Sequence, residues 1–242
     1  MACMKTGIMI LGQHSDSLGE KKLLMKCASY LESKGRKRVC IAFHSGTPGS
    51  EEVMLQMNAA GIDTYAIVPL AISEGKKTVW LMPKALRLPD NCGSWTIIDG
   101  KDVATRFATA LGEDPGMAYA LAEREGRPEG GTAILLLARG SIHSTCAKTS
   151  EYYADALREK GWTVECGYCH HGRSVEDAAR AILDAGFSHI RVVPLFVAFD
   201  GKSADRARET LSSVPAEIDY SEPISEISLY LSIVDSKIPD GW

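Results

Sequence analysis

The sequence lacks a long apolar run, a leader-like start and an excess of positive charge. No uninterrupted apolar segment approaches the roughly 18 residues that a membrane-spanning helix needs. The first residues, Met1–Lys5, lead directly into a strand pattern, without the hydrophobic region and cleavage site of a signal peptide. The formal net charge is −4, which argues against a nucleic-acid or anionic-membrane partner held by bulk electrostatics. We therefore expect a cytoplasmic protein with no nucleic-acid partner and no membrane partner.

The sequence also lacks the paired cysteine spacing of a structural metal site. Its seven cysteines are an odd number, and the single C-x-x-C, Cys166–Cys169, follows a strand pattern instead of opening a helix. This position argues against a thioredoxin-like role. Free, mostly buried thiols are the expectation for a reducing compartment.

An internal repeat is present, with an offset near 125 residues. Residues 7–15 match residues 133–141, and residues 60–70 match residues 185–195. A stretch rich in Gly and Pro, residues 126–131, separates the two copies. We therefore predict two duplicated domains, 1–128 and 129–242, because self-similarity at a fixed period indicates repeated structural units.

Each half alternates apolar strand patterns with helical periods. In the first half we predict strands at 7–12, 38–43 and 64–70; in the second half, Ser174 with Asp177 three residues later predicts the start of a helix. Alternation of this kind indicates a parallel sheet covered by helices on both faces. The predicted fold class is α/β, with two domains that each hold a parallel four-stranded sheet.

Ligands of open parallel sheets bind beyond the carboxyl ends of the strands. This rule selects the loops at 12–17, 43–49 and 71–77 in the first half and their counterparts at 138–145, 168–173 and 196–203 in the second. The polar side chains in these loops are the candidate functional residues.

The order and spacing of several short motifs resemble the class II tetrapyrrole chelatases, the sirohydrochlorin cobaltochelatase and nickelochelatase group. Members of that group carry G-H-G-S after strand one, V-P-L-F followed by G-x-H, and a later L-G-x-D-P. Here Val68-Pro69-Leu70 precedes Gly75-Lys76-Lys77, Val193-Pro194-Leu195-Phe196 precedes Gly201-Lys202, and Leu111–Pro115 reads LGEDP. The resemblance covers nearly the whole chain, twice, as in the longer members of the family.

The resemblance implies binding of an anionic tetrapyrrole and insertion of a divalent metal (Co, Ni or Fe), which is a substrate, with no organic cofactor. In the family, a histidine after strand one and another after strand three bind the metal or take up pyrrole protons. Neutral imidazole suits both tasks near pH 7. This sequence departs from the family at these positions, because Gln13 and Arg139 replace the first histidine and Lys77 and Lys202 replace the second.

Two residues of the first half are the candidates for chemistry in the absence of those histidines. His14 follows Gln13 by one place and is a candidate metal ligand or base, on the premise that a turn absorbs the shift of one residue; the alternative is a solvated loop histidine. Lys77 is the other catalytic candidate, although a lysine pKa near 10.4 would need a shift of several units. His44 is a candidate second metal ligand, with an ordinary loop residue as the alternative.

The remaining polar residues of the rims are better suited to substrate binding. Cations pair with carboxylates, arginine in a bidentate way, and hydroxyls and amides donate hydrogen bonds to them. A second-half metal site at Cys169, His170 and His171 is a less favoured alternative, and Trp80 is expected in the core more than against a flat macrocycle. The predicted substrate-binding residues are Gln13, Ser15, Lys76, Arg139, Ser141 and Lys202.

Three functions stay open from the sequence. The chain is a chelatase, or a non-catalytic relative that binds a tetrapyrrole, a metal or another anion, or a protein that uses the same rim for an unrelated reaction. The expected partner is a small-molecule tetrapyrrole, and the expected assembly is a monomer or a homodimer.

Overall fold

A computed structural model describes residues 5–88, 95–98 and 101–240 of the chain. Its contacts group the described residues into two compact units. Unit 1 runs to Leu111 and also takes in the segment from Leu231 onward, whereas unit 2 is Gly112–Tyr230. No helix within the described ranges combines the length and the apolar character that a membrane crossing requires.

Unit 1 is built around a sheet in the order β2-β1-β3-β5-β4. The first four of these strands are parallel, and β4 adds an antiparallel edge. Its elements are β1 (Thr6–His14), α1 (Leu18–Ser33), β2 (Val39–Ser45), α2 (Ser50–Ala59), β3 (Thr64–Pro69), the π-helical turn η1 (Lys77–Leu81), α3 (Met82–Ala85), β4 (Trp95–Ile98) and β5 (Lys101–Phe107).

Unit 2 contains a parallel sheet in the order β7-β6-β8-β9. The chain leaves it through α8 (Leu229–Ser236), which begins at the end of unit 2 and continues into unit 1. The other elements are α4 (Pro115–Glu125), β6 (Thr132–Ala138), α5 (Ser144–Glu159), β7 (Val164–Tyr168), α6 (Val175–Asp184), β8 (His189–Leu195), α7 (Gly201–Ser212), β9 (Glu217–Tyr220) and the short 3₁₀ turn η3 (Ile224–Glu226).

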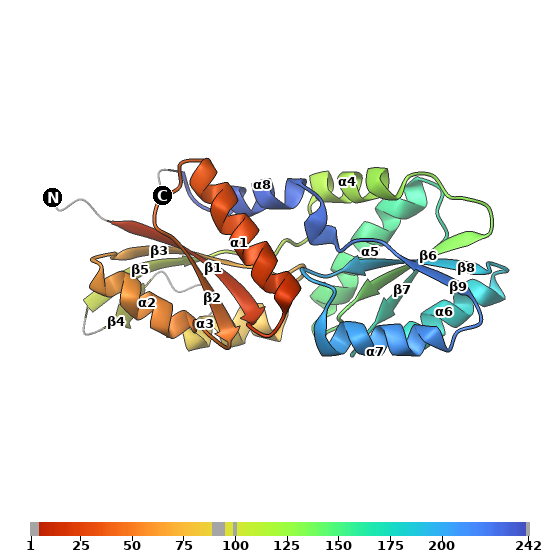
Figure 1. Ribbon diagram of the computed structural model, residues 1–242, viewed down its shortest axis with the longest axis horizontal. Coiled ribbons are helices and arrows are strands. Elements are labelled where there is room, and N and C mark those ends of the chain that lie inside the picture. Colours follow the sequence, from red (N-terminus) through yellow and green to blue (C-terminus); the bar gives the residue numbers. More distant parts are fainter. Residues whose placement is uncertain (1–4, 89–94, 99–100, 241–242) are drawn as a thin grey trace. The chain divides into compact units, whose positions relative to one another are not determined.

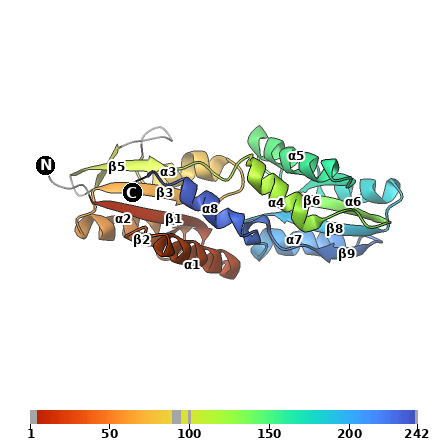
Figure 2. The ribbon, with the colours of Figure 1, turned by 90° about the horizontal axis from the view of Figure 1, so that it is seen from above.

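Each sheet is covered by helices on both faces, as Figures 1 and 2 show. In unit 1, Met9 and Leu11 of β1 pack with Met54 of α2 and Met82 of α3. Side chains alternate along a strand, so the intervening buried residues of β1 face α1. The predicted α/β class with two four-stranded parallel sheets is therefore confirmed, and β4 is an addition that the sequence analysis did not foresee.

In unit 2 the buried strand β6 has the same arrangement. Leu135 and Leu137 pack with Ile182 of α6 and Leu211 of α7, and α5 covers the opposite face. The Ser174 hydroxyl accepts a hydrogen bond from the Asp177 amide at 3.0 Å, so the predicted start of α6 is confirmed.

The compact units do not end where the sequence repeat begins again. The predicted boundary at residue 128 separates the two sequence copies, whereas α4 belongs to unit 2 and the C-terminal segment belongs to unit 1. Arg36, in the loop after α1, holds that segment through Asp235 at 2.8 Å and the Pro239 carbonyl at 3.0 Å. The boundary at residue 128 stays a prediction about the sequence repeat. By contacts, α4 groups with unit 2, and α8 groups with unit 1 from Leu231 onward.

Candidate functional site

The carboxyl ends of β1 and β2 and the start of η1 meet at one edge of the unit 1 sheet. His14 is the last residue of β1 and pairs in parallel register with Ser45, the last residue of β2. The predicted strand 7–12 therefore ends two residues too early. His14 lies in the strand, because backbone pairing with β2 continues to its end, and the premise that a loose turn absorbs the shift of one residue is wrong.

A buried carboxylate fixes the end of β1. Glu20, in the first turn of α1, accepts hydrogen bonds from the backbone amides of Gln13 at 2.5 Å and His14 at 3.1 Å. The Glu20 amide in turn donates to the Ser17 hydroxyl at 2.9 Å, which caps α1. These contacts hold the backbone of Gln13 and His14 in one conformation.

Sequence reasoning missed Glu20, although its signal was present. Ser17 followed by Glu20 has the spacing of a capping box, in which the glutamate side chain normally returns to the backbone at the cap. Here the carboxylate reaches further back, to the end of the preceding strand. The pattern predicts the helix start, but not that Glu20 positions the candidate site.

Lys77 contacts two of the predicted residues of the first half. Its Nζ lies 2.7 Å from His14 Nε2 and 3.2 Å from Gln13 Oε1. All three side chains are half-buried. A lysine ammonium has donors only, so the Lys77–His14 contact requires a lone pair on His14 Nε2 and places the proton of a neutral His14 on Nδ1.

His44 stands beside this group on β2. The pairs Gly12–Phe43 and His14–Ser45 place it next to Gln13 in the sheet. Burial, and then the positive charge of Lys77, lower the pKa of His44 below its ordinary value of 6.5. Its Nδ1 is buried and has no hydrogen-bond partner in the part of the chain that the structure describes. His44 is therefore a neutral imidazole near pH 7.

Two other predicted binding residues of unit 1 lie apart from these contacts. Ser15 packs against Gly46, where an added Cβ would lie 1.8 Å from the serine hydroxyl. Lys76 is exposed, and its Nζ lies 5.6 Å from the centre of the Trp80 ring. The structure thus groups Gln13, His14, His44 and Lys77, and places Lys76 on a neighbouring surface.

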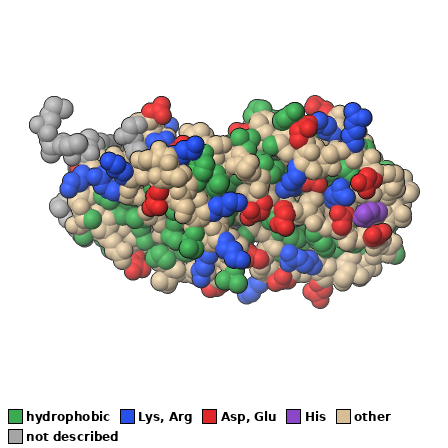
Figure 3. All heavy atoms as spheres, turned by 45° about the horizontal axis from the view of Figure 1, so that its top comes forward, with side chains coloured by type: hydrophobic (Ala, Val, Ile, Leu, Met, Phe, Trp, Pro, Cys, Tyr) green, Lys and Arg blue, Asp and Glu red, His purple; other side chains and the backbone are tan. Residues whose placement is uncertain are grey.

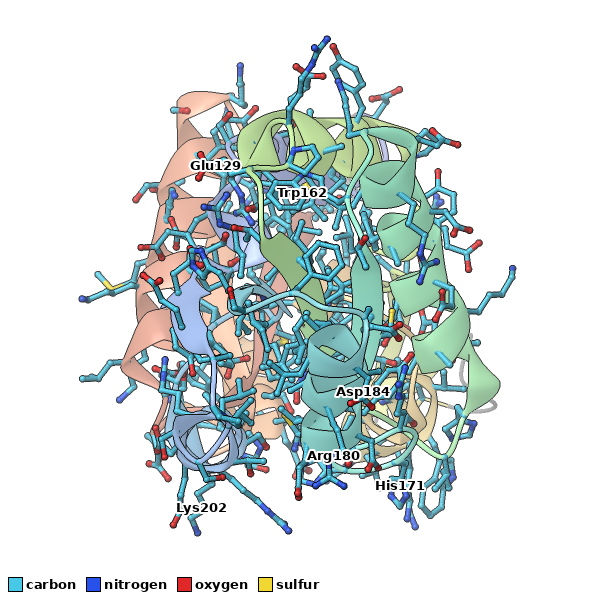
Figure 4. All side chains as sticks on the ribbon, turned by 90° about the vertical axis from the view of Figure 1, so that its right-hand side faces the viewer. Glu129, Trp162, His171, Arg180, Asp184 and Lys202 are labelled. Atoms are coloured by element: carbon cyan, nitrogen blue, oxygen red, sulfur yellow. The ribbon has the colours of Figure 1, made fainter. Side chains whose placement is uncertain are left out.

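The rim of unit 2 is more open. Arg139 is exposed, and Lys202, in the first turn of α7, projects away from the protein in Figure 4. The Ser141 hydroxyl accepts a hydrogen bond from the His143 amide at 3.2 Å, which is ordinary turn chemistry. A glycine at position 140 is required, because an added Cβ would lie 2.5 Å from the His171 carbonyl oxygen.

Neither half contains a three-ligand metal site among the described residues. Within residues 5–88, 95–98 and 101–240, no group of three or more His, Cys, Asp or Glu side chains is placed to hold a metal ion. His170 Nε2 lies 3.0 Å from the Ser203 hydroxyl, and His171 projects into solvent in Figure 4. Burial raises the pKa of Cys169 to about 11 despite the opposing charges of Arg139 and Arg206, so its thiol is protonated at pH 7.

The unit 1 group can hold an anion, accept a proton and supply imidazole nitrogen to a metal. Lys77 provides the positive charge, and His14 and His44 provide two imidazoles. Imidazole nitrogen suits the divalent ions of cobalt, nickel and iron. Lys77 contacts His14 directly and its charge acts on His44, so all three side chains lie near this edge of the unit 1 sheet.

Comparison with known proteins gives matches over both halves. The CbiX family model matches residues 8–127 and again residues 133–240. The sirohydrochlorin cobaltochelatase of Methanosarcina acetivorans is 30% identical over 113 residues, which are 46% of this chain and 86% of that protein. These matches confirm the predicted resemblance to the chelatases and the internal duplication.

Solved structures agree at the level of the fold. SirB from Bacillus subtilis with Fe³⁺ superposes with a TM-score of 0.70 at 18% identity, over 97% of this chain and 94% of that one. A multi-domain Deinococcus radiodurans protein with structural similarity to chelatases gives a TM-score of 0.69 at 20% identity over 99% of this chain. The match covers 56% of the Deinococcus protein, so this chain spans little more than half of its length.

Proposed function

Since the chain belongs to the CbiX family, we propose that it binds a sirohydrochlorin-type tetrapyrrole at the unit 1 edge and inserts a divalent metal. Co, Ni and Fe are the proposed metals. Support comes from relatives named cobaltochelatases and from the likeness to SirB with Fe³⁺. The His14, His44 and Lys77 side chains are the proposed machinery.

The observation that carries the proposal is the neutral His44 imidazole beside Lys77. Insertion of a divalent ion displaces two N–H protons from the macrocycle, so the site needs an acceptor that is unprotonated near pH 7. The lowered pKa of His44 supplies that state, and its buried, unpartnered ring nitrogen is a polar atom left without a hydrogen bond in the described part of the chain. His44 is therefore the proposed first ligand or base.

Lys77 makes His14 available only when an anion is bound. The ammonium occupies His14 Nε2 at 2.7 Å. A substrate carboxylate is a stronger partner for an ammonium than a neutral imidazole, because both groups are charged. A carboxylate that draws Lys77 away opens Nε2 as a second ligand or proton acceptor. Lys77 thus serves by binding substrate, without the large pKa shift that action as a base would require.

The same contact favours a second candidate function. If Lys77 stays on His14, its positive charge repels a divalent ion, and the chain binds a tetrapyrrole, a metal or another anion without insertion. Gln13, Ser15, Lys76, Arg139, Ser141 and Lys202 remain proposed substrate-binding residues under either function. The cytoplasmic location and the monomeric or homodimeric state likewise remain predictions from the sequence.

A spectroscopic assay distinguishes the two candidates. Purified protein is mixed with sirohydrochlorin and Co²⁺, Ni²⁺ or Fe²⁺, and the visible spectrum is followed against the uncatalysed rate. We expect insertion faster than the uncatalysed reaction, lost in His44→Gln and kept in the control His143→Gln, which alters an exposed histidine of unit 2. Binding without acceleration supports the second candidate, and the absence of tetrapyrrole binding contradicts both.

A further inference from the structure

An exposed aromatic side chain lies on the helical segment that begins at Lys77. Trp80 of η1 is 47% exposed and its neighbour Val79 is 36% exposed, so the expectation that Trp80 packs in the core is wrong. Lys76 Nζ and Lys84 Nζ lie 5.6 Å and 5.1 Å from the centre of the Trp80 ring. We call Lys76, Val79, Trp80 and Lys84 the Trp80 patch.

The two lysines of the Trp80 patch form no ion pair with any carboxylate that the structure describes. Among the described residues, neither ammonium has an acidic partner within ion-pair distance, and the indole ring is the contact that each makes. Elsewhere cations are commonly paired; Lys160, for example, forms an ion pair with Glu123. Figure 3 shows acidic and basic side chains interspersed over the face in view. Two unbalanced cations around an exposed ring are therefore a local feature of this segment.

The nearest carboxylate in the sequence is committed to holding the segment in place. Glu74 accepts hydrogen bonds from the Thr78 hydroxyl at 2.8 Å and the Ala110 amide at 2.7 Å. Thr78 is buried and also accepts from the Gly75 amide at 2.9 Å. Glu74 thus anchors the start of η1 and leaves the patch with a net positive charge.

The patch adjoins the candidate site along the chain. Lys76 directly precedes Lys77, whose ammonium contacts His14. A ligand with several carboxylates can therefore pair with Lys77 at the sheet edge and with Lys76 at the patch. The exposed ring adds a flat apolar surface, which favours a flat aromatic ligand over a small inorganic anion.

We propose that the Trp80 patch is a further substrate-binding surface, on which a flat polycarboxylate macrocycle stacks against the indole and pairs with Lys76 and Lys84. The inference rests on the proposed function, because the ligand is the same tetrapyrrole. As the macrocycle stacks, the Lys76 and Lys84 ammonium groups leave the Trp80 ring and pair with carboxylates of the macrocycle. Stacking contributes affinity that is largely independent of salt, and the ion pairs contribute affinity that weakens as salt rises.

Tetrapyrrole titrations of three proteins test the patch. Sirohydrochlorin absorbance gives the dissociation constant without relying on tryptophan, and quenching of tryptophan emission reports stacking. We expect Trp80→Leu to bind about tenfold more weakly, with less quenching on saturation. The double variant Lys76→Gln/Lys84→Gln is expected to bind about tenfold more weakly at low salt, with a smaller difference in 0.5 M salt. Because these side chains are exposed, both variants are expected to keep the far-ultraviolet circular dichroism of the parent.

The chain offers a matched control at the end of α1, where Nζ of Lys34, the residue after the helix, lies 5.3 Å from the centre of the Tyr30 ring. Tyr30→Leu and Lys34→Gln are expected to bind as the parent does. Unchanged affinity in both patch variants, or equal weakening in the control variants, overturns the inference and leaves the proposed function standing. If the parent chain itself binds no sirohydrochlorin, the proposed function and the inference both fail.

Discussion

Lys77 Nζ lies 2.7 Å from His14 Nε2, although 63 residues separate them in the sequence. The lysine also donates to the Gln13 side chain at 3.2 Å. In the resemblance, Gln13 stands at the position of the first histidine and His14 follows it. Lys77, which stands at the position of the second histidine, thus contacts both. The contact places a positive charge beside the His14 ring nitrogen that is proposed as a metal ligand.

Removal of that charge is expected to strengthen metal binding in the absence of tetrapyrrole. In Lys77→Met, His14 Nε2 loses its ammonium partner and a nearby repulsive charge, so Co²⁺ is expected to bind about tenfold more tightly. Calorimetric titration with Co²⁺ alone measures the change. Lys202→Met, at the matching position of unit 2, is the control, and equal affinity in all three proteins would show that Lys77 does not restrict His14.

The pH dependence of His44 follows from its lowered pKa. Burial and Lys77 both disfavour the imidazolium, so the imidazole stays neutral at pH 6.5 and gains its proton only at lower pH. Nuclear magnetic resonance of the ring protons is expected to show a midpoint below 6.5, which moves toward 6.5 in Lys77→Met. The folded state resists this protonation, so His44 lowers stability as pH falls below the unfolded value near 6.5. A midpoint above 6.5 would contradict this account.

Glu20 is expected to contribute to stability through the end of β1. Glu20→Ala leaves the Gln13 and His14 amides without their acceptor, and the free energy of unfolding is expected to fall by about 3 kcal/mol. Ser17→Ala removes the helix cap, with an expected loss of about 1 kcal/mol. Urea denaturation compares the two variants. Similar losses in both would mean that the carboxylate contributes no more than the cap.

Replacement of two glycines with positive φ distinguishes the cost of a steric clash from the cost of backbone strain alone. Gly140 has φ +81° and Gly186 has φ +91°, but only at Gly140 would a Cβ meet other atoms, at 2.5 Å from the His171 carbonyl oxygen. Gly186→Ala is expected to lower the free energy of unfolding by about 1 kcal/mol and Gly140→Ala by about 3 kcal/mol. Denaturant melts measure both, and a Gly140→Ala loss no larger than that of Gly186→Ala would remove the clash as the reason for glycine.

Arg36 is expected to hold the C-terminal segment against unit 1. Its ion pair with Asp235 is largely buried, with 15% and 27% of the two side chains exposed. Arg36→Met leaves Asp235 without this partner, so amide hydrogen exchange in residues 231–240 is expected to rise about tenfold. Arg38→Met, which alters an exposed arginine on the same loop, is the control. Unchanged exchange in Arg36→Met would show that other contacts hold the segment.

Local pattern was sufficient to predict the fold. Alternating strand and helix periods predicted parallel sheets, and the match between residues 60–70 and 185–195 indicated the duplication. The Ser174 cap also followed from sequence, because a capping hydrogen bond spans only three residues. The periods and the cap depend on near neighbours in the chain and the duplication depends on repeated sequence, so all can be recognised without knowledge of distant contacts.

The length of β1 could not be predicted from the sequence pattern. The sequence pattern ended the strand at residue 12, since Gln13 and His14 are polar, but pairing with β2 carries it to His14. Trp80 shows the opposite error, because aromatic side chains are usually buried and this one is exposed, with two lysines beside its ring.

The sequence by itself determined the α/β architecture, the duplication, the family resemblance and the replacement of the histidines that the resemblance implies. Each of these depends on the order, spacing and type of residues along the chain. Only the tertiary structure decided that Lys77 contacts His14 and that Glu20 fixes the carboxyl end of β1. It also decided that the segment from Leu231 onward joins unit 1. These are contacts between side chains and backbone at positions set by the packing of whole elements. Hydrophobic periodicity specifies which elements form, but the path of the folded chain specifies which polar groups meet.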